Sequence, residues 1–355
     1  MSELRQILAL WNRAKALREE VCLATVVQIE GSSYRKPGAR MLLTSGGQRA
    51  GTVSGGCLEA EISKKAWWLT ESGPTVQKYS SFFDEDTGIP YGLGCGGTAW
   101  VLLERGPAAA SILEALRRSI EEQTASAIVT AIGPNRVGTQ LVLTENEKSC
   151  PPPVDELSGK EPLLELANQA LREKISLHTD AYFVEYLAPP SSLHIFGAGD
   201  DAQPLVEFGY ALGWHISVTD GRSHLARLER FPLADSVSVH RAGDALHIAP
   251  NDAAVIMTHS YQQDGAFLKE LLPRDLAYLG ILGPRLRTAR LLKEVASQIG
   301  LSLEEAMQRL HAPVGLNIGA TNPAGIALSI AAEIQAAFAG RSPSLAKIPD
   351  EARAC

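Results

Sequence analysis

The stretch LHIFGAGDDAQ, residues 193–203, constrains the fold of this chain more than any other segment. An apolar run leads directly into the pattern G-x-G-x-x-A, and a helical segment follows. In folds of the Rossmann type, Gly197 permits the tight turn, Gly199 lets a phosphate approach the backbone, and Ala202 allows close packing of helix on strand. Asp220 ends the next apolar run, where the ribose-binding acid of such folds is found. The stretch therefore predicts a Rossmann-like domain.

The rest of the chain shows where this domain begins and ends. After Leu193 the apolar runs VSVH, AAVIMTH and AYLGILG follow, separated by helical stretches, which predicts a parallel sheet with helices on both faces. The first half instead has the pattern of a mixed α+β domain, and APPSS is the predicted linker. We expect an α/β protein with an α+β domain over 1–188, a doubly wound Rossmann-like domain over 189–342, and a tail over 343–355.

Composition excludes several classes of protein. The net charge of −7 argues against a general nucleic-acid or membrane-surface binder, because phosphate affinity comes mainly from clustered Lys and Arg. No apolar run approaches the roughly 20 residues that span a bilayer, and the first residues lack the features of a signal peptide, so we expect a cytoplasmic protein. The five cysteines are far apart without a C-x-x-C pair. They indicate free thiols rather than a disulfide framework or a zinc module.

The charged residues around the glycine turn support opposite predictions about phosphate binding. Asp200 and Asp201 lie beside the turn and oppose a pyrophosphate, whereas Arg222, two residues after Asp220, can meet a phosphate. The alternatives are a site for a nucleotide-like ligand, with NAD(P) as one candidate, and a retained fold whose turn binds nothing.

Other candidates follow the later strands, at the carboxyl ends where open α/β sheets bind ligands. His259 ends MTHS, and Gly283 and Arg285 belong to LGILGPRLR. His259 is either a ligand contact or a loop histidine satisfied by solvent or by the core. Arg285 either binds an anion or is a solvated surface charge.

Two glycine-rich motifs in the first half contain cysteine. GTVSGGCLEAEI, residues 51–62, places Cys57 just before a helical stretch, where backbone N–H groups and the helix dipole stabilise a thiolate. GLGCGGT, residues 92–98, places Cys95 in a similar glycine cradle. Each thiol is either a working group or a small residue that fills a tight turn.

Several motifs together resemble one family over nearly the whole chain. QIEGSSYRKPGARMLL, GTVSGGCLEAEI, GLGCGGTAWVLLE, GAGDDAQP, THSYQQD, YLGILGPRLRTAR and GLNIGATNPAGIALSIAAEI are similar to motifs of the XdhC/CoxI family, the xanthine dehydrogenase accessory proteins of bacteria. Two details depart from the family pattern. Pro284 stands where a small hydroxyl residue is expected, and THSYQQD lacks an acidic run, which weakens any proposal of a metal there.

The resemblance implies a function that composition does not show. Members bind molybdenum cofactor, a pterin dithiolene phosphate, and protect it. They cooperate with a cysteine desulfurase that supplies its terminal sulfur, and they deliver it to a molybdenum hydroxylase apoenzyme. The resemblance thus implies a carrier or chaperone rather than a turnover enzyme, and we expect a homodimer.

The implied cofactor also gives the two thiols a role, because soft metals and sulfur species favour sulfur ligands. Cys57 is the first candidate for a contact with the cofactor, including its molybdenum, and Cys95 is the second. Ser32, Ser33, Arg35 and Arg40 are candidates to assist an anion, with the alternative that the two arginines are surface charges. The residues expected to supply contacts around the thiols are Ser54, Gly55, Gly56, Glu59, Gly94, Gly96 and Gly97.

Two other functions remain open. An NAD(P)-dependent oxidoreductase would use Gly197, Gly199 and Asp220, with His259 as its one plausible proton donor. An adaptor would dock desulfurase and apoenzyme without holding cofactor.

Overall fold

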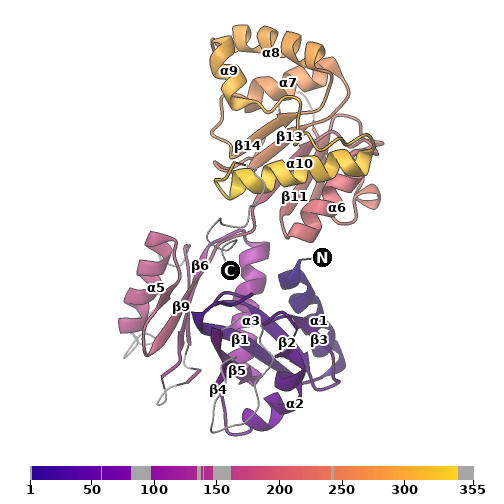
Figure 1. Cartoon of the computed structure of the whole chain (residues 1–355). Coiled ribbons are helices and arrows are strands. Elements are labelled where there is room, and N and C mark those ends of the chain that lie inside the picture. The colour runs from indigo at the N-terminus through magenta and orange to yellow at the C-terminus, as the bar shows by residue number, and fades with distance from the viewer. Residues whose placement is uncertain are drawn as a thin grey trace, which may run out of the picture. The chain divides into compact units, whose positions relative to one another are not determined.

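The computed structural model describes residues 2–56, 58–80, 97–133, 137–138, 140–146, 161–240 and 244–342 (Figure 1). The chain divides into two compact units, Met1–Pro190 and Ser191–Cys355, and each is described by itself. The predicted tail over 343–355 lies outside the described residues. Within the described part of the chain, no helix is long and apolar enough to cross a membrane.

The first unit begins with an antiparallel sheet of five strands in the order β3-β2-β1-β5-β4. Its strands are β1 (Val21–Gly31), β2 (Arg40–Thr44), β3 (Arg49–Gly51), β4 (Thr75–Ser80) and β5 (Gly97–Arg105). Three helices accompany it: α1 (Glu3–Leu17), α2 (Glu59–Leu69) and α3 (Gly106–Glu121). Apolar residues of β1 alternate between the two faces. Ala24 packs in the core that includes α2, while Leu23 packs in the core that includes α1 and α3.

A second sheet completes this unit, in the order β7-β6-β9-β8. Its strands are β6 (Ser126–Ala131), β7 (Gln140–Thr144), β8 (Leu177–His178) and β9 (Tyr182–Leu187). Helix α5 (Glu161–Glu173) buries Leu163, Ala167 and Leu171 against Val129 and Val184 of the sheet. The first unit therefore has the mixed α+β architecture predicted for the first half of the chain.

A buried ion pair connects the two sheets and corrects one expectation. Arg40 was a candidate anion contact or surface charge, but only 6% of it is exposed. Its Nη1 donates to Glu185 Oε1 at 2.8 Å, and its Nη2 donates to Glu185 Oε2. The guanidinium is committed to this partner, because a buried charge without one would carry a large desolvation cost.

The second unit contains a fully parallel sheet in the order β12-β11-β10-β13-β14. Its strands are β10 (Ser192–Phe196), β11 (His215–Asp220), β12 (Ser236–Val239), β13 (Ala253–Ile256) and β14 (Tyr278–Ile281). The helices are α6 (Ala202–Leu212), α7 (Tyr261–Leu271), α8 (Arg285–Ile299), α9 (Leu303–Arg309) and α10 (Pro323–Phe338), with a short 3-10 helix, η2 (Leu228–Arg230).

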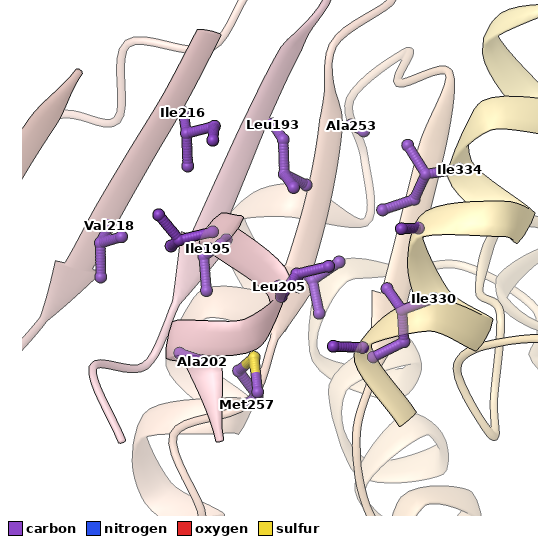
Figure 2. Close-up of a cluster of buried hydrophobic side chains, with 14 of the residues drawn as sticks. Leu193, Ile195, Ala202, Leu205, Ile216, Val218, Ala253, Met257, Ile330 and Ile334 are labelled. Atoms are coloured by element: carbon purple, nitrogen blue, oxygen red, sulfur yellow. The ribbon is translucent and has the colours of Figure 1, made fainter. Parts of the chain in front are cut away.

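Helices cover both faces of this sheet, which confirms the predicted doubly wound class. Figure 2 shows Leu193 and Ile195 of β10 facing Leu205 of α6 and Ile330 of α10. On the opposite face, Phe196 packs in a core with residues of α7 and α8. One detail was predicted wrongly. The connection from β12 to β13 has no helix in its described residues, 240 and 244–252.

Candidate functional site

Glu59 organises the loop that leads into α2. Only 2% of Glu59 is exposed. Its Oε1 accepts hydrogen bonds from the backbone N–H groups of Val53 at 3.1 Å and Ser54 at 2.8 Å, and its Oε2 accepts one from Ser54 Oγ at 2.6 Å. Burial alone raises the pKa of Glu59, but the hydrogen bonds from Ser54 and Val53 outweigh it and leave the pKa below its usual range. Glu59 is therefore a buried carboxylate that holds the loop.

Ser54 extends this arrangement to both sides of position 57. Its Oγ accepts hydrogen bonds from the backbone N–H groups of Gly56 and Leu58, each at 3.1 Å. Gly56 has φ 117°, a conformation that favours glycine. Cys57 itself lies outside the described residues. The backbone on either side of it is tied to one hydroxyl, which in turn is held by Glu59.

A second loop, residues 32–35, is attached to the first through α1. Arg35 Nη2 donates to Glu3 Oε2, and Glu3 Oε1 accepts from the N–H of Thr52 at 2.7 Å and from its Oγ1 at 2.9 Å. Arg35 N–H also donates to Ser33 Oγ at 3.4 Å. The guanidinium of Arg35 is thus paired with the Glu3 carboxylate. It is not an unpaired charge placed to bind an anion.

Gly97 brings the start of β5 against the same region. It pairs in register with Gly31 at the end of β1. A Cβ built on Gly97 would lie 2.1 Å from the carbonyl oxygen of Ser32, which is far inside van der Waals contact. Only glycine allows the two backbones to approach so closely.

These three segments line one small pocket. Among the residues expected at the cofactor, Ser32, Ser33, Ser54, Gly55 and Gly97 all lie on its wall. The structure therefore joins the described edges of the two glycine-rich motifs. The full wall of the pocket consists of Ser32, Ser33, Tyr34, Val53, Ser54, Gly55, Leu58, Gly97, Thr98 and Ala99. The expected contacts Gly94, Cys95 and Gly96 lie outside the described residues.

Sequence reasoning did not single out the other five members of this wall as candidate contacts: Tyr34, Val53, Leu58, Thr98 and Ala99. The signal for Tyr34 was present, because it is the one aromatic residue in the turn-rich loop GSSYRKPGAR. Thr98 carried no such signal, since it has the appearance of an ordinary β-strand residue in TAWVLLE.

In the second unit, the glycine turn lies where the strand order reverses, since β10 is flanked by β11 and β13. Gly197 has φ 128°, and a Cβ built on it would lie 2.3 Å from the carbonyl oxygen of Met257. The turn after β10 is thus packed directly on the segment after β13. This is the topological switch point at which open α/β sheets bind ligands.

The carboxylate of Asp201 occupies the space beside Gly199. A Cβ built there would lie 2.5 Å from Asp201 Oδ1. Asp201 Oδ2 lies 2.7 Å from the Nε2 atom of His259, which itself has a positive φ of 60°. A phosphate approaching Gly199 would have to displace this negatively charged group.

Asp220 is fully buried, and both of its carboxylate oxygens accept hydrogen bonds. Its Oδ2 accepts from Ala198 N–H at 2.8 Å and from Arg222 Nη2 at 2.7 Å, and its Oδ1 accepts from Arg222 N–H at 2.8 Å and Nε at 2.9 Å. Burial raises the pKa of Asp220, but the bonds from Arg222 and Ala198 outweigh it and lower the pKa overall. Arg222 and Asp220 thus neutralise one another at the position expected to bind ribose.

The remaining charges near the turn are also paired. Arg230, which the sequence did not single out, donates to the carbonyl oxygen of Ala198 and to Asp200 Oδ1, each at 2.6 Å.

Gly283 has φ 158° and precedes α8. Arg285, the first residue of α8, lines a largely apolar pocket with residues of α8 and α9 such as Leu303 and Met307.

Among the described residues, no group of three or more His, Cys, Asp or Glu side chains is placed to hold a metal ion.

The architecture defines a class: an α+β unit with a serine-glycine loop at a helix N-terminus, and a Rossmann-type unit with a G-x-G-x-x-A turn. The model of the XdhC and CoxI family matches residues 14–80, and that of the XdhC Rossmann domain matches residues 193–334. The chain belongs to the XdhC and CoxI family.

Similar proteins cover most of the chain. A probable xanthine dehydrogenase subunit of Bacillus subtilis (strain 168) is 33% identical, over 89% of this chain and 93% of its own length. The molybdenum cofactor insertion chaperone PaoD of Escherichia coli (strain K12) is 26% identical, over 88% of this chain and 81% of its own length. A crystal structure described as a xanthine dehydrogenase from Bacillus halodurans superposes with a TM-score of 0.73, at 29% sequence identity and over 98% of each chain.

Proposed function

We propose that this protein carries molybdenum cofactor for a xanthine dehydrogenase-type molybdenum hydroxylase. It holds and protects the cofactor, supports its sulfuration by a cysteine desulfurase, and inserts it into the apoenzyme. The proposed setting is the cytoplasm, and the proposed assembly is a homodimer. The observation that carries the proposal is the pocket on which the described edges of both cysteine motifs meet, in a chain similar to a named cofactor insertion chaperone.

The residues around the pocket suit a carrier. Ser54 and Glu59 fix the backbone before α2, so the position of Cys57 in the sequence falls between two anchored amides, Gly56 and Leu58. A thiolate next to a helix N-terminus is stabilised by the helix dipole, and it suits a soft metal or a sulfur transfer step. The proposal therefore assigns the contact with the molybdenum end of the cofactor to Cys57, with Cys95 as the second thiol.

The second unit gives no comparable support for a hydride-transfer enzyme. A dinucleotide would require Asp201 to leave Gly199 and Arg222 to release Asp220. Each step exposes a charge that the protein now pairs, which opposes binding. The proposed function therefore involves no NAD(P).

The test is the pterin content of the purified full chain. Protein from cofactor-replete cells should release a fluorescent pterin after acid treatment and oxidation, and it should activate a cofactor-free molybdenum hydroxylase. A Cys57→Ala/Cys95→Ala double variant should lose most of both signals, whereas Cys355→Ala, a thiol outside both motifs, should retain them.

Two outcomes would contradict the proposal. Wild-type protein without pterin and without effect on the hydroxylase would remove the carrier function altogether. A double variant with full activity and no bound pterin would instead favour an adaptor that docks the partners.

A further inference from the structure

An exposed aromatic ring stands at the pocket of the first unit. Tyr34 is 80% exposed, although it lines the pocket together with Ser33, Ser54 and Gly55. A Cβ built on Gly55 would lie 3.5 Å from Tyr34 Cδ2, so the ring reaches the backbone of the serine-glycine loop. Most of the ring surface remains accessible to a ligand, and the face of such a ring stacks well on another flat π system.

The loop that carries Tyr34 is held in place on one side. Its neighbour Arg35 is paired with Glu3, and the same carboxylate accepts two hydrogen bonds from Thr52 just before the serine-glycine loop. The two loops are therefore positioned relative to each other by a common anchor. A stacking surface that is held in this way loses little conformational entropy when a ligand binds.

The charged groups in and next to the pocket wall indicate which part of a ligand can bind there. Within the described wall of the pocket there is no Lys or Arg. The N–H groups of Gly56 and Leu58 already donate to Ser54 Oγ, and the buried charge next to them is the Glu59 carboxylate.

A phosphate is bound most strongly by Lys and Arg side chains, and the described wall offers neither. It offers serine hydroxyls and an aromatic face, which suit an uncharged, planar heterocycle with hydrogen-bonding edges.

We propose that Tyr34 is the stacking surface for the heteroaromatic ring of the ligand, and that the hydroxyls of Ser32 and Ser33 bind the ring's edge. The phosphate of the same ligand is bound away from this wall. The identification of the ring as a pterin rests on the proposed function. The stacking role itself is a property of the pocket and can be tested separately.

The probe is free oxidised pterin, titrated into the full chain and followed by its fluorescence. Tyr34→Ala should bind it about ten-fold more weakly, which corresponds to roughly 1.4 kcal/mol and is typical of one lost stacking contact. Tyr34→Phe and Tyr34→Trp should keep the wild-type affinity, because both retain a flat ring. Trp68→Ala is the matched control, since Trp68 is 70% exposed but does not line the pocket. Inorganic phosphate should not compete with the pterin.

The outcomes separate this inference from the proposed function. Wild-type protein that fails to bind free pterin, or a Tyr34→Ala variant that binds it as tightly as wild type, overturns the stacking role. Either result leaves the carrier function intact if the protein still holds pterin from cells. Wild-type protein that binds the probe through Tyr34 but carries no pterin from cells supports the stacking role and removes the carrier function. Competition by phosphate overturns the placement of the phosphate away from this wall.

Discussion

At the scale of single residues, Glu104 on β5 shows how burial alters an ionisable group. It is fully buried between the two sheets of the first unit, where its Oε1 accepts from Gln140 Nε2 at 2.6 Å. Its Oε2 has no hydrogen-bond partner among the described residues. Burial raises the pKa of Glu104 to about 7, although the bond from Gln140 and the nearby Arg40 act in the opposite direction.

This pKa predicts a dependence of stability on pH. Between the ordinary value near 4.5 and the folded value of about 7, the folded state binds more protons at Glu104 than the unfolded state does. The free energy of unfolding should therefore fall as pH rises through this window, by about 3 kcal/mol in total. Glu104→Gln should remove this part of the dependence and stabilise the protein at pH 8 but not at pH 4.5.

Denaturant unfolding at both pH values, followed by tryptophan fluorescence, measures the effect. Four of the five tryptophans precede Pro190, so the signal reports mainly on the first unit. An equal difference between wild type and variant at the two pH values would show that the carboxyl group does not titrate in this window.

Ser54 is the second residue with a testable role. Ser54→Ala removes the acceptor for the N–H groups of Gly56 and Leu58 and the donor to Glu59, so we expect a loss of roughly 1–2 kcal/mol in stability. The pterin content should fall as well, because the loop is no longer held. Ser63→Ala on α2 is the control, since its hydroxyl donates only to a carbonyl one turn earlier, that of Glu59. Unfolding curves and pterin assays that do not distinguish the two variants would contradict the role of Ser54.

At the scale of elements, two glycines are required for different reasons: one for lack of space, the other for its backbone conformation. Gly97 joins β5 to β1 and has no room for a Cβ, whereas Gly300 ends α8 with φ 75° and open space around it. Gly97→Ala should cost about 3 kcal/mol, because the strands must move apart. Gly300→Ala should cost about 1 kcal/mol, from left-handed backbone strain alone. Thermal and denaturant unfolding would show the order reversed if the close approach of Gly97 to Ser32 is easily relieved.

Elements were also the level at which the sequence was most informative. The strands around LHIFG and AAVIMTH follow from short-range apolar patterns, which depend on neighbours along the chain. The absence of a helix from the described residues between β12 and β13 was not predictable in the same way, since a short polar connection and a helical one can carry similar residues.

The candidate site was predictable where glycine or serine marks a loop and unpredictable where long-range partners decide. Arg40 is buried because Glu185, far away in the sequence, lies opposite it. Asp220 had the position of a ribose acid, but Arg222 satisfies both of its oxygens. Spacing along a chain identifies neither pairing in advance, because each depends on how the folded segments meet.

At the scale of the whole molecule, the two units have separate cores. The parallel sheet, α6 and α10 bury Leu193, Ile195 and Ile330 within Ser191–Cys355. We therefore expect residues 191–355 to fold alone and to unfold cooperatively when expressed as a fragment. Circular dichroism during thermal unfolding is the measurement. A broad transition without a cooperative midpoint would show that this unit depends on the first.

The position of Glu3 has a practical consequence for handling the protein. Its carboxylate, in the first turn of α1, is the shared anchor of the Tyr34 loop and of the segment that precedes the serine-glycine loop. An affinity tag or leader fused just ahead of Ser2 would place additional charge and bulk next to the Glu3 carboxylate. A preparation that carries such an extension can lose ligand for reasons unrelated to the pocket itself, and a cleavable tag on the opposite end of the chain avoids that ambiguity.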